Sequence, residues 1–250
     1  MNLPVEVVEA TRNQKCSVII GSRATLEAAL EQDRRYPDER AIAKALGGKI
    51  LPRDACAALE AKVGRAAMVR QVQALIGAAD VPPYAAHKLA LSRFSRLFTS
   101  AMDDLLERTA QEMGLAYEVR YRGEAIPEPD PAKKLIYKLR GGFERPETLV
   151  LTEADFKAKP FGDLAKDVRK LLRRDIAFFL GYRPDEQEFD HIFEDFSDAF
   201  GGELPRCHLA VAQGKISDYH WQKWVWRGLL LFTADPLEAL TSLEEQVDAR

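Results

Sequence analysis

Short apolar runs rich in β-branched and aromatic residues alternate along the chain with longer segments of helical periodicity. The runs at residues 16–21 and 176–181 are almost continuously apolar, as is typical of strands covered on both faces of a parallel sheet. The alternation predicts an α/β protein with a Rossmann-like, mostly parallel sheet and helices on both faces. Further strands are expected at residues 96–99, 116–120, 135–139, 148–152, 208–212 and 229–232.

A long helical stretch separates the first two expected strands. Residues 37–46 and 52–76 have the 3.6-residue periodicity of helices, and glycine and proline residues punctuate them. We therefore expect residues 1–250 to form a single domain that carries a helical insertion at about residues 47–91. Other helices are expected at residues 84–91, 102–113, 161–174, 184–200 and 219–226, and from Pro236 onward.

Charge and cysteine content exclude several classes of ligand. The net charge of −3 provides no positive field for nucleic acid. Cys16, Cys56 and Cys207 lie far apart, which fits a reducing compartment and gives no metal-ligand spacing. No export signal and no apolar run of membrane-spanning length is visible. We expect a cytoplasmic protein that binds no metal, no membrane and no nucleic acid directly.

Four segments carry motif-like sequences in a fixed order. They are VIIGSRAT at residues 18–25, FTSAMDDLLER at 98–108, IYKLRGGFERPETLVLTEADF at 136–156 and FFLGYRPDEQEF at 178–189. In turn they resemble a glycine-rich GAGAS turn, a TTNYDDLLE segment, a lysine-leucine-histidine-glycine strand end with VLTEDDY, and an FLGYS strand. Those four motifs are typical of the bacterial sirtuin-like, NAD-binding domain family, which is found in many defence-associated proteins. The resemblance extends over most of the chain.

The first segment departs from the family at one glycine. The resemblance implies that the backbone after the first strand approaches the diphosphate of the dinucleotide. Gly21 and Ser22 keep this turn, but Arg23 stands where the family has its next glycine, so the side chain should block the closest approach. Its guanidinium either binds phosphate or faces water.

The other three segments lack the polar residues on which the family's chemistry depends. The asparagine of the family aligns with Ala101, which has no side-chain hydrogen-bonding group. Its general-base histidine aligns with Arg140, which cannot lose a proton, and the serine after the last strand becomes Arg183. Asp103 is retained, either as a helix cap or as a site residue. The resemblance therefore predicts a pseudoenzyme without catalytic residues.

The strand ends should bring the binding residues to one crevice. The expected set is Gly21, Ser22, Arg23, Thr99, Asp103, Arg140, Gly141, Gly181 and Arg183. Its three arginines either attract the phosphates of NAD or ADP-ribose or pair with nearby acidic side chains. Those acids are Asp103, Glu153 and Asp185.

Three functions remain open from the sequence. The first is an inactive sirtuin-like scaffold, sensor or regulatory subunit, in prokaryotic antiphage defence as the resemblance implies, with a protein partner or as a homo-oligomer. The second is an NAD glycohydrolase in which Asp103 or His87 replaces the missing groups. The third is a structural oligomerisation protein that binds no nucleotide.

His191 and Asp195 share a helix face that could bind metal, but no third ligand is in view.

Overall fold

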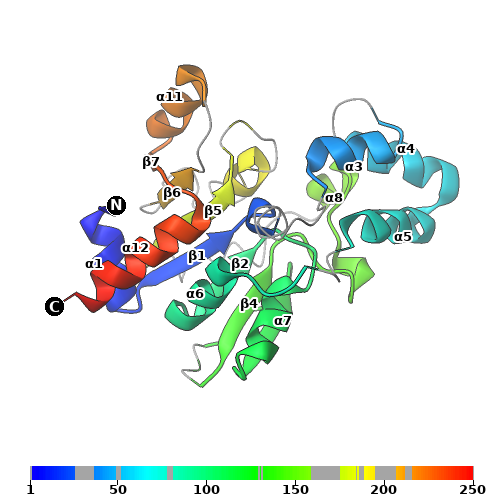
Figure 1. The fold of residues 1–250 in the computed structure, drawn as a ribbon. Coiled ribbons are helices and arrows are strands. Elements are labelled where there is room, and N and C mark those ends of the chain that lie inside the picture. The colour runs from blue at the N-terminus through cyan, green and yellow to red at the C-terminus, as the bar shows by residue number, and fades with distance from the viewer. Residues whose placement is uncertain are drawn as a thin grey trace.

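A seven-stranded sheet forms the centre of the computed structural model (Figure 1). The strand order is β3-β4-β2-β1-β5-β6-β7, and every neighbouring pair is parallel. The Rossmann-like α/β class predicted from the alternation is therefore confirmed. The structure describes residues 2–25, 37–48, 52–77, 81–128, 130, 132–158, 175–183, 185, 189–194, 207–211 and 216–249.

Seven of the expected strands are present with their ends shifted by at most two residues. They are β1 (Cys16–Ile20), β2 (Arg96–Thr99), β3 (Tyr117–Tyr121), β4 (Lys134–Lys138), β5 (Ile176–Tyr182), β6 (Cys207–Val211) and β7 (Leu229–Thr233). The strand expected at residues 148–152 is wrong. A 3-10 turn, η2 (Pro146–Thr148), enters this segment, and Leu149 and Leu151 are apolar because they pack in a core beside the sheet.

The strands are apolar because both faces of the sheet are covered. Val18 and Ile20 of β1 point into one core, and Ile19 between them points into another. The first face is covered by α1 (Val5–Arg12), α6 (Ala85–Arg93), α7 (Leu105–Glu112) and α12 (Pro236–Asp248). The helical residues 189–194 and α11 (Asp218–Trp226) pack on the second face. No helix within the described ranges is both long and apolar enough to cross a membrane.

A separate group of helices lies beside one end of the sheet (Figure 1). It consists of α3 (Glu39–Ala45), α4 (Pro52–Val63), α5 (Arg65–Ile76) and α8 (Glu153–Ala158). The helix expected over residues 52–76 is broken at Gly64, whose φ of +80° interrupts the helical backbone. Of the other expected helices, residues 161–174 lie outside the described residues, and only 189–194 of the span 184–200 are described.

The helix expected to begin at Met102 begins instead at Leu105. The hydroxyl of Thr99 accepts a hydrogen bond from the backbone N–H of Ala101, and the carboxylate of Asp103 accepts one from that of Leu105, each at 3.0 Å. Such local side-chain bonds compete with the helical pattern. They keep residues 100–104 as a loop at the carboxyl end of β2.

Two glycines meet where the order of the sheet reverses between β1 and β5. The chain leaves β1 toward β2 and leaves β5 toward β6, so the loops diverge and open the position where such sheets bind ligands. A Cβ added to Gly21 would lie 2.2 Å from the carbonyl oxygen of Gly181. A Cβ added to Gly181, whose φ is +68°, would likewise lie 2.8 Å from the backbone nitrogen of Ala24. Gly21 is thus required by backbone packing, independently of any ligand.

We predict that Gly21→Ala lowers the free energy of unfolding by about 3 kcal/mol, because backbone atoms cannot yield to the new methyl group. Gly47→Ala is the matched control, since Gly47 has a positive φ of +81° but open space around its Cβ position, and it should cost about 1 kcal/mol. Urea unfolding measures both. Equal losses in the two variants would show that the contact between β1 and β5 does not require glycine.

Candidate functional site

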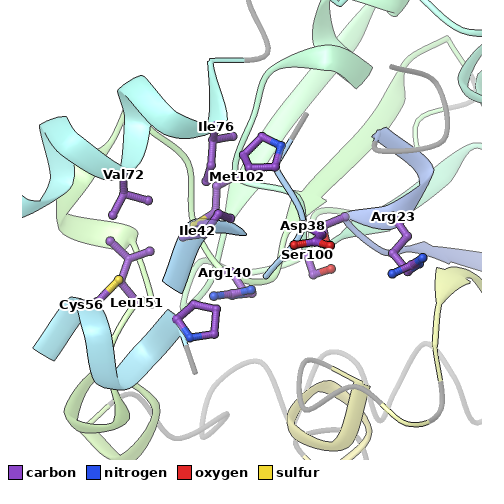
Figure 2. A pocket seen from close by; sticks show the side chains of 13 residues that line it. Arg23, Asp38, Ile42, Cys56, Val72, Ile76, Ser100, Met102, Arg140 and Leu151 are labelled. Atoms are coloured by element: carbon purple, nitrogen blue, oxygen red, sulfur yellow. The ribbon is translucent and has the colours of Figure 1, made fainter. Parts of the chain in front are cut away.

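A cleft of about 700 Å³, part of it open to solvent, lies at the carboxyl ends of the central strands (Figure 2). Its described lining residues are Ser22, Arg23, Pro37, Asp38, Ile42, Pro52, Cys56, Val72, Ile76, Ser100, Met102, Arg140 and Leu151. The sheet supplies one wall and the helical group α3–α5 supplies the other.

The polar half of the cleft comes from three strand ends. Ser22 and Arg23 follow β1, Ser100 follows β2 and Arg140 follows β4. The carboxylate of Asp38 accepts a hydrogen bond of 2.7 Å from the backbone N–H of Ala41 and so caps α3. Figure 2 shows Arg23, Asp38 and Ser100 on one side, with Arg140 toward the middle. Hydroxyl and guanidinium groups at such a position suit phosphate oxygens.

Arg140 is held in place by its neighbours. Its Nε and Nη2 atoms donate to the carbonyl oxygen of Val150 at 3.4 Å, and its guanidinium lies 5.9 Å from the ring centre of Phe156. The preceding turn is tight, because a Cβ on Gly141 would lie 2.3 Å from the carbonyl oxygen of Thr148. The side chain therefore reaches the cleft from a fixed backbone, as a cation that cannot accept a proton.

The inner half of the cleft is apolar. Ile42, Val72, Ile76 and Leu151 face it (Figure 2). Cys56 also lines it, and burial raises the pKa of its thiol to about 11 despite the nearby guanidinium groups of Arg140 and Arg65. The thiol is therefore protonated at neutral pH and is a poor nucleophile.

Some of the expected site residues line the cleft, and others are not among its described lining residues. Ser22, Arg23 and Arg140 are brought together as lining residues of the cleft. Arg183 is not among the described lining residues, and it donates through Nε and Nη2 to both carboxylate oxygens of Asp185 at 2.9 and 2.7 Å. Asp185, one of the acidic residues expected as a partner for the arginines, therefore pairs with Arg183.

Beneath the cleft, Tyr182 of β5 closes the space at the end of β1. Its hydroxyl donates to the hydroxyl of Ser100 at 3.0 Å, and both residues are buried. Thr99 is also buried and directs its hydroxyl to the backbone of Ala101. Thr99, Gly21, Gly141 and Gly181 thus shape the floor and turns of the site and are not among its described lining residues.

Asp103 and His87 lie in the protein interior. Asp103 is 8% exposed and His87 is 2% exposed, and neither is among the described residues that line the cleft. Burial lowers the pKa of His87 to about 4, although the charge of Asp103 opposes this change. The imidazole is therefore neutral at physiological pH.

A buried ion pair lies next to Asp103. The ammonium group of Lys138 is 2.6 Å from Oε1 of Glu107 and donates to the carbonyl oxygen of Asp103, whereas Oε2 of Glu107 is buried without a hydrogen-bond partner. Burial raises the pKa of Glu107 to about 7, even though Lys138 stabilises its charged form. Burial lowers the pKa of Lys138, but its attraction to Glu107 outweighs this and leaves that pKa raised.

The contact between His191 and Arg53 was not expected from the sequence. Nη1 of Arg53 is 3.0 Å from Nε2 of His191 and also bonds to the carboxylate of Glu153, while the His191 ring packs 4.5 Å from that of Phe156. Because arginine only donates, Nε2 must accept, so the lone pair of His191 is occupied. Burial and the charges of Arg53 and Arg140 lower the pKa of His191.

The structure does not test the metal face expected from His191 and Asp195, because Asp195 lies outside the described residues. Among those that are described, no group of three or more histidine, cysteine, aspartate or glutamate side chains is arranged to hold a metal ion.

The fold and the cleft define an α/β domain of the Rossmann-like class, with its pocket where such sheets bind ligands. More particularly, the chain belongs to the SIR2-like domain family, because the model of that family matches residues 95–228, more than half of its 250 residues. The sirtuin-like resemblance is therefore confirmed. The match begins just before β2 and leaves β1 and the turn that follows it outside. No curated protein matches the chain.

We predict that Glu107→Gln alters the pH dependence of stability. The pKa of Glu107 is raised from 4.5 to about 7, so between these values the folded state binds more protons than the unfolded chain, and stability falls as pH rises. The stability of the variant relative to the native chain should therefore increase by up to about 3 kcal/mol across this range.

Chemical denaturation at several pH values measures this difference. His87 acts in the opposite direction, because its pKa is lowered from 6.5 to about 4 and its contribution to stability rises with pH between these values. Since His87 is present in both proteins, its contribution cancels in the comparison. A difference between the two proteins that does not change with pH would contradict the buried, half-satisfied state of Glu107.

Proposed function

We propose that this SIR2-like module binds a diphosphate nucleotide such as NAD or ADP-ribose in the cleft and does not hydrolyse it. The observation that carries the proposal is the convergence of Arg23 and Arg140 on one pocket, with the hydroxyl groups of Ser22 and Ser100 beside them. Two guanidinium groups and two hydroxyl groups provide the donors that a diphosphate needs. Membership of an NAD-related family supports this ligand class.

The described lining of the cleft supports the absence of hydrolysis. A general base must lie within hydrogen-bonding reach of the water that it activates. Among the described residues that line the pocket, Asp38 is the sole carboxylate, and its Oδ1 caps α3. Asp103 and His87, the residues considered for a displaced active site, are buried and are not among the described lining residues, and the lone pair of His191 is occupied by Arg53.

We further propose that the single domain of residues 1–250 acts as a scaffold, sensor or regulatory subunit in the cytoplasm, with a protein partner or a second copy. The exposed Tyr219 and Trp226 of α11, at 70% and 83% of their surface, support such a contact, since large exposed apolar groups are typical of interaction surfaces. The motif resemblance to defence-associated proteins supports a role in antiphage defence. The helices of the insertion then act as one wall of the ligand site.

We predict that Arg23→Ala and Arg140→Ala each weaken ADP-ribose binding by roughly tenfold or more, because each removes a charge-assisted contact with phosphate. Arg183→Ala is the matched control, since Arg183 pairs with Asp185 and should leave the affinity within about twofold of the native value. Isothermal titration calorimetry measures the three affinities, and thermal melting confirms that each variant is folded. Equal affinities for all proteins would contradict the arginine site.

We also predict that incubation of the protein with NAD releases no nicotinamide above the uncatalysed rate. Chromatographic detection of nicotinamide, with the protein alone and with proteins encoded beside it, checks this expectation. Robust release that is abolished by Arg140→Ala or Asp103→Ala would overturn the proposed lack of catalysis and favour the NAD glycohydrolase.

A further inference from the structure

The Lys138–Glu107 pair joins two segments that form the polar half of the cleft, the end of β4 and the loop after β2. Lys138 ends β4, two residues before Arg140. Its ammonium group bonds to the carbonyl oxygen of Asp103, in the loop that carries Ser100 and Met102 into the cleft. The same ammonium contacts Glu107 in the first turn of α7. One fully buried cation therefore lies directly behind the loop and the strand end that would hold an anion.

The two members of the pair are unequally satisfied. Lys138 has two oxygen acceptors, Oε1 of Glu107 and the carbonyl of Asp103. Glu107 is 7% exposed, and its second carboxylate oxygen is buried without a hydrogen-bond partner. A buried carboxylate that is only half satisfied is poorly stabilised in its charged form. Of the two groups, Glu107 is therefore the one that gives up its charge first.

We propose that Glu107 regulates the cleft, so that protonation of this carboxylate removes the charge that pairs with Lys138 and increases the affinity for anionic ligands. This inference rests on the proposed nucleotide site. The neutral carboxyl group keeps an oxygen that accepts from Lys138, so the geometry of the walls is retained while the local charge becomes more positive. The interaction between two charges is stronger in a protein interior than in water and weakens with distance, and the linkage is reciprocal, so the bound anion favours protonated Glu107.

The other ionisable groups around the pair come from every element packed against it. Asp103 faces Glu107 and Lys138 from the loop before α7, and His87 of α6 faces Asp103. Tyr121 of β3 and Glu144 after β4 also face the pair, and the buried Arg122 follows β3, with its backbone N–H donating to the carbonyl oxygen of Lys138. The pKa of Glu107, raised to about 7, lies within the physiological range, whereas the pKa of His87 is lowered to about 4 and burial raises that of Tyr121 from its ordinary value. Glu107 thus titrates where the regulation would operate.

The test is the pH profile of ADP-ribose binding by the intact chain, measured by calorimetry between about pH 6 and pH 8. The diphosphate of ADP-ribose keeps its charge over this range, so the ligand contributes no titration of its own. The native protein should bind roughly five- to tenfold more tightly at the lower pH. Glu107→Gln should bind at both pH values with the higher affinity, because it carries the neutral form permanently.

Glu112→Gln is the matched control, because Glu112 lies on the same helix and pairs with Lys88 at the surface. It should reproduce the native profile. If the native protein and Glu107→Gln bind with the same pH dependence, or if the native affinity does not change with pH, the regulatory role of Glu107 is overturned while the nucleotide site stands. If the native protein binds no ADP-ribose at any pH, the proposed function and this inference both fail.

Discussion

The close contact between Gly21 and Gly181 determines the geometry of the whole site. Backbone atoms of β1 and β5 approach each other at the position where the strand order reverses, and a single methyl group on Gly21 would meet the carbonyl oxygen of Gly181 at 2.2 Å. This contact fixes the turn that carries Arg23 and places the Tyr182 ring under the end of β1. Gly21 is therefore required for packing between β1 and β5, and Arg23, two residues later, lines the pocket.

A second constraint acts behind the pocket. Lys138 is fully buried in the last position of a strand, where only an acidic partner and a backbone oxygen make its charge tolerable. By binding Glu107 and the Asp103 carbonyl, it ties two of the motif-bearing segments together. Asp103 is thus used in the architecture of the loop, through its carboxylate to Leu105 and its carbonyl to Lys138.

The sheet could be predicted because burial on both faces makes every central strand apolar, and the order of the motifs identified the family. The strand expected at residues 148–152 failed because a run such as Leu149–Leu151 is equally apolar when it packs in a side core.

Arg23 and Arg140 could be assigned to one crevice because the ends of parallel strands share an edge. Arg183 also follows the end of a strand, but its guanidinium pairs with the carboxylate of Asp185, two residues later. Periodicity gives no sign of contacts between distant segments, such as Arg53 with His191. The ion pair of Lys138 could have been expected from the sequence in one respect. Lys138 follows an apolar run in β4, and a buried lysine needs a charged partner.

The most direct test of the account is a crystal structure of the protein after prolonged incubation with NAD. We expect intact NAD in the cleft, with its diphosphate against the side chains of Arg23 and Arg140. Density for a cleaved product, or NAD bound at a place remote from both arginines, would contradict the proposal that this SIR2-like cleft holds a dinucleotide without hydrolysing it.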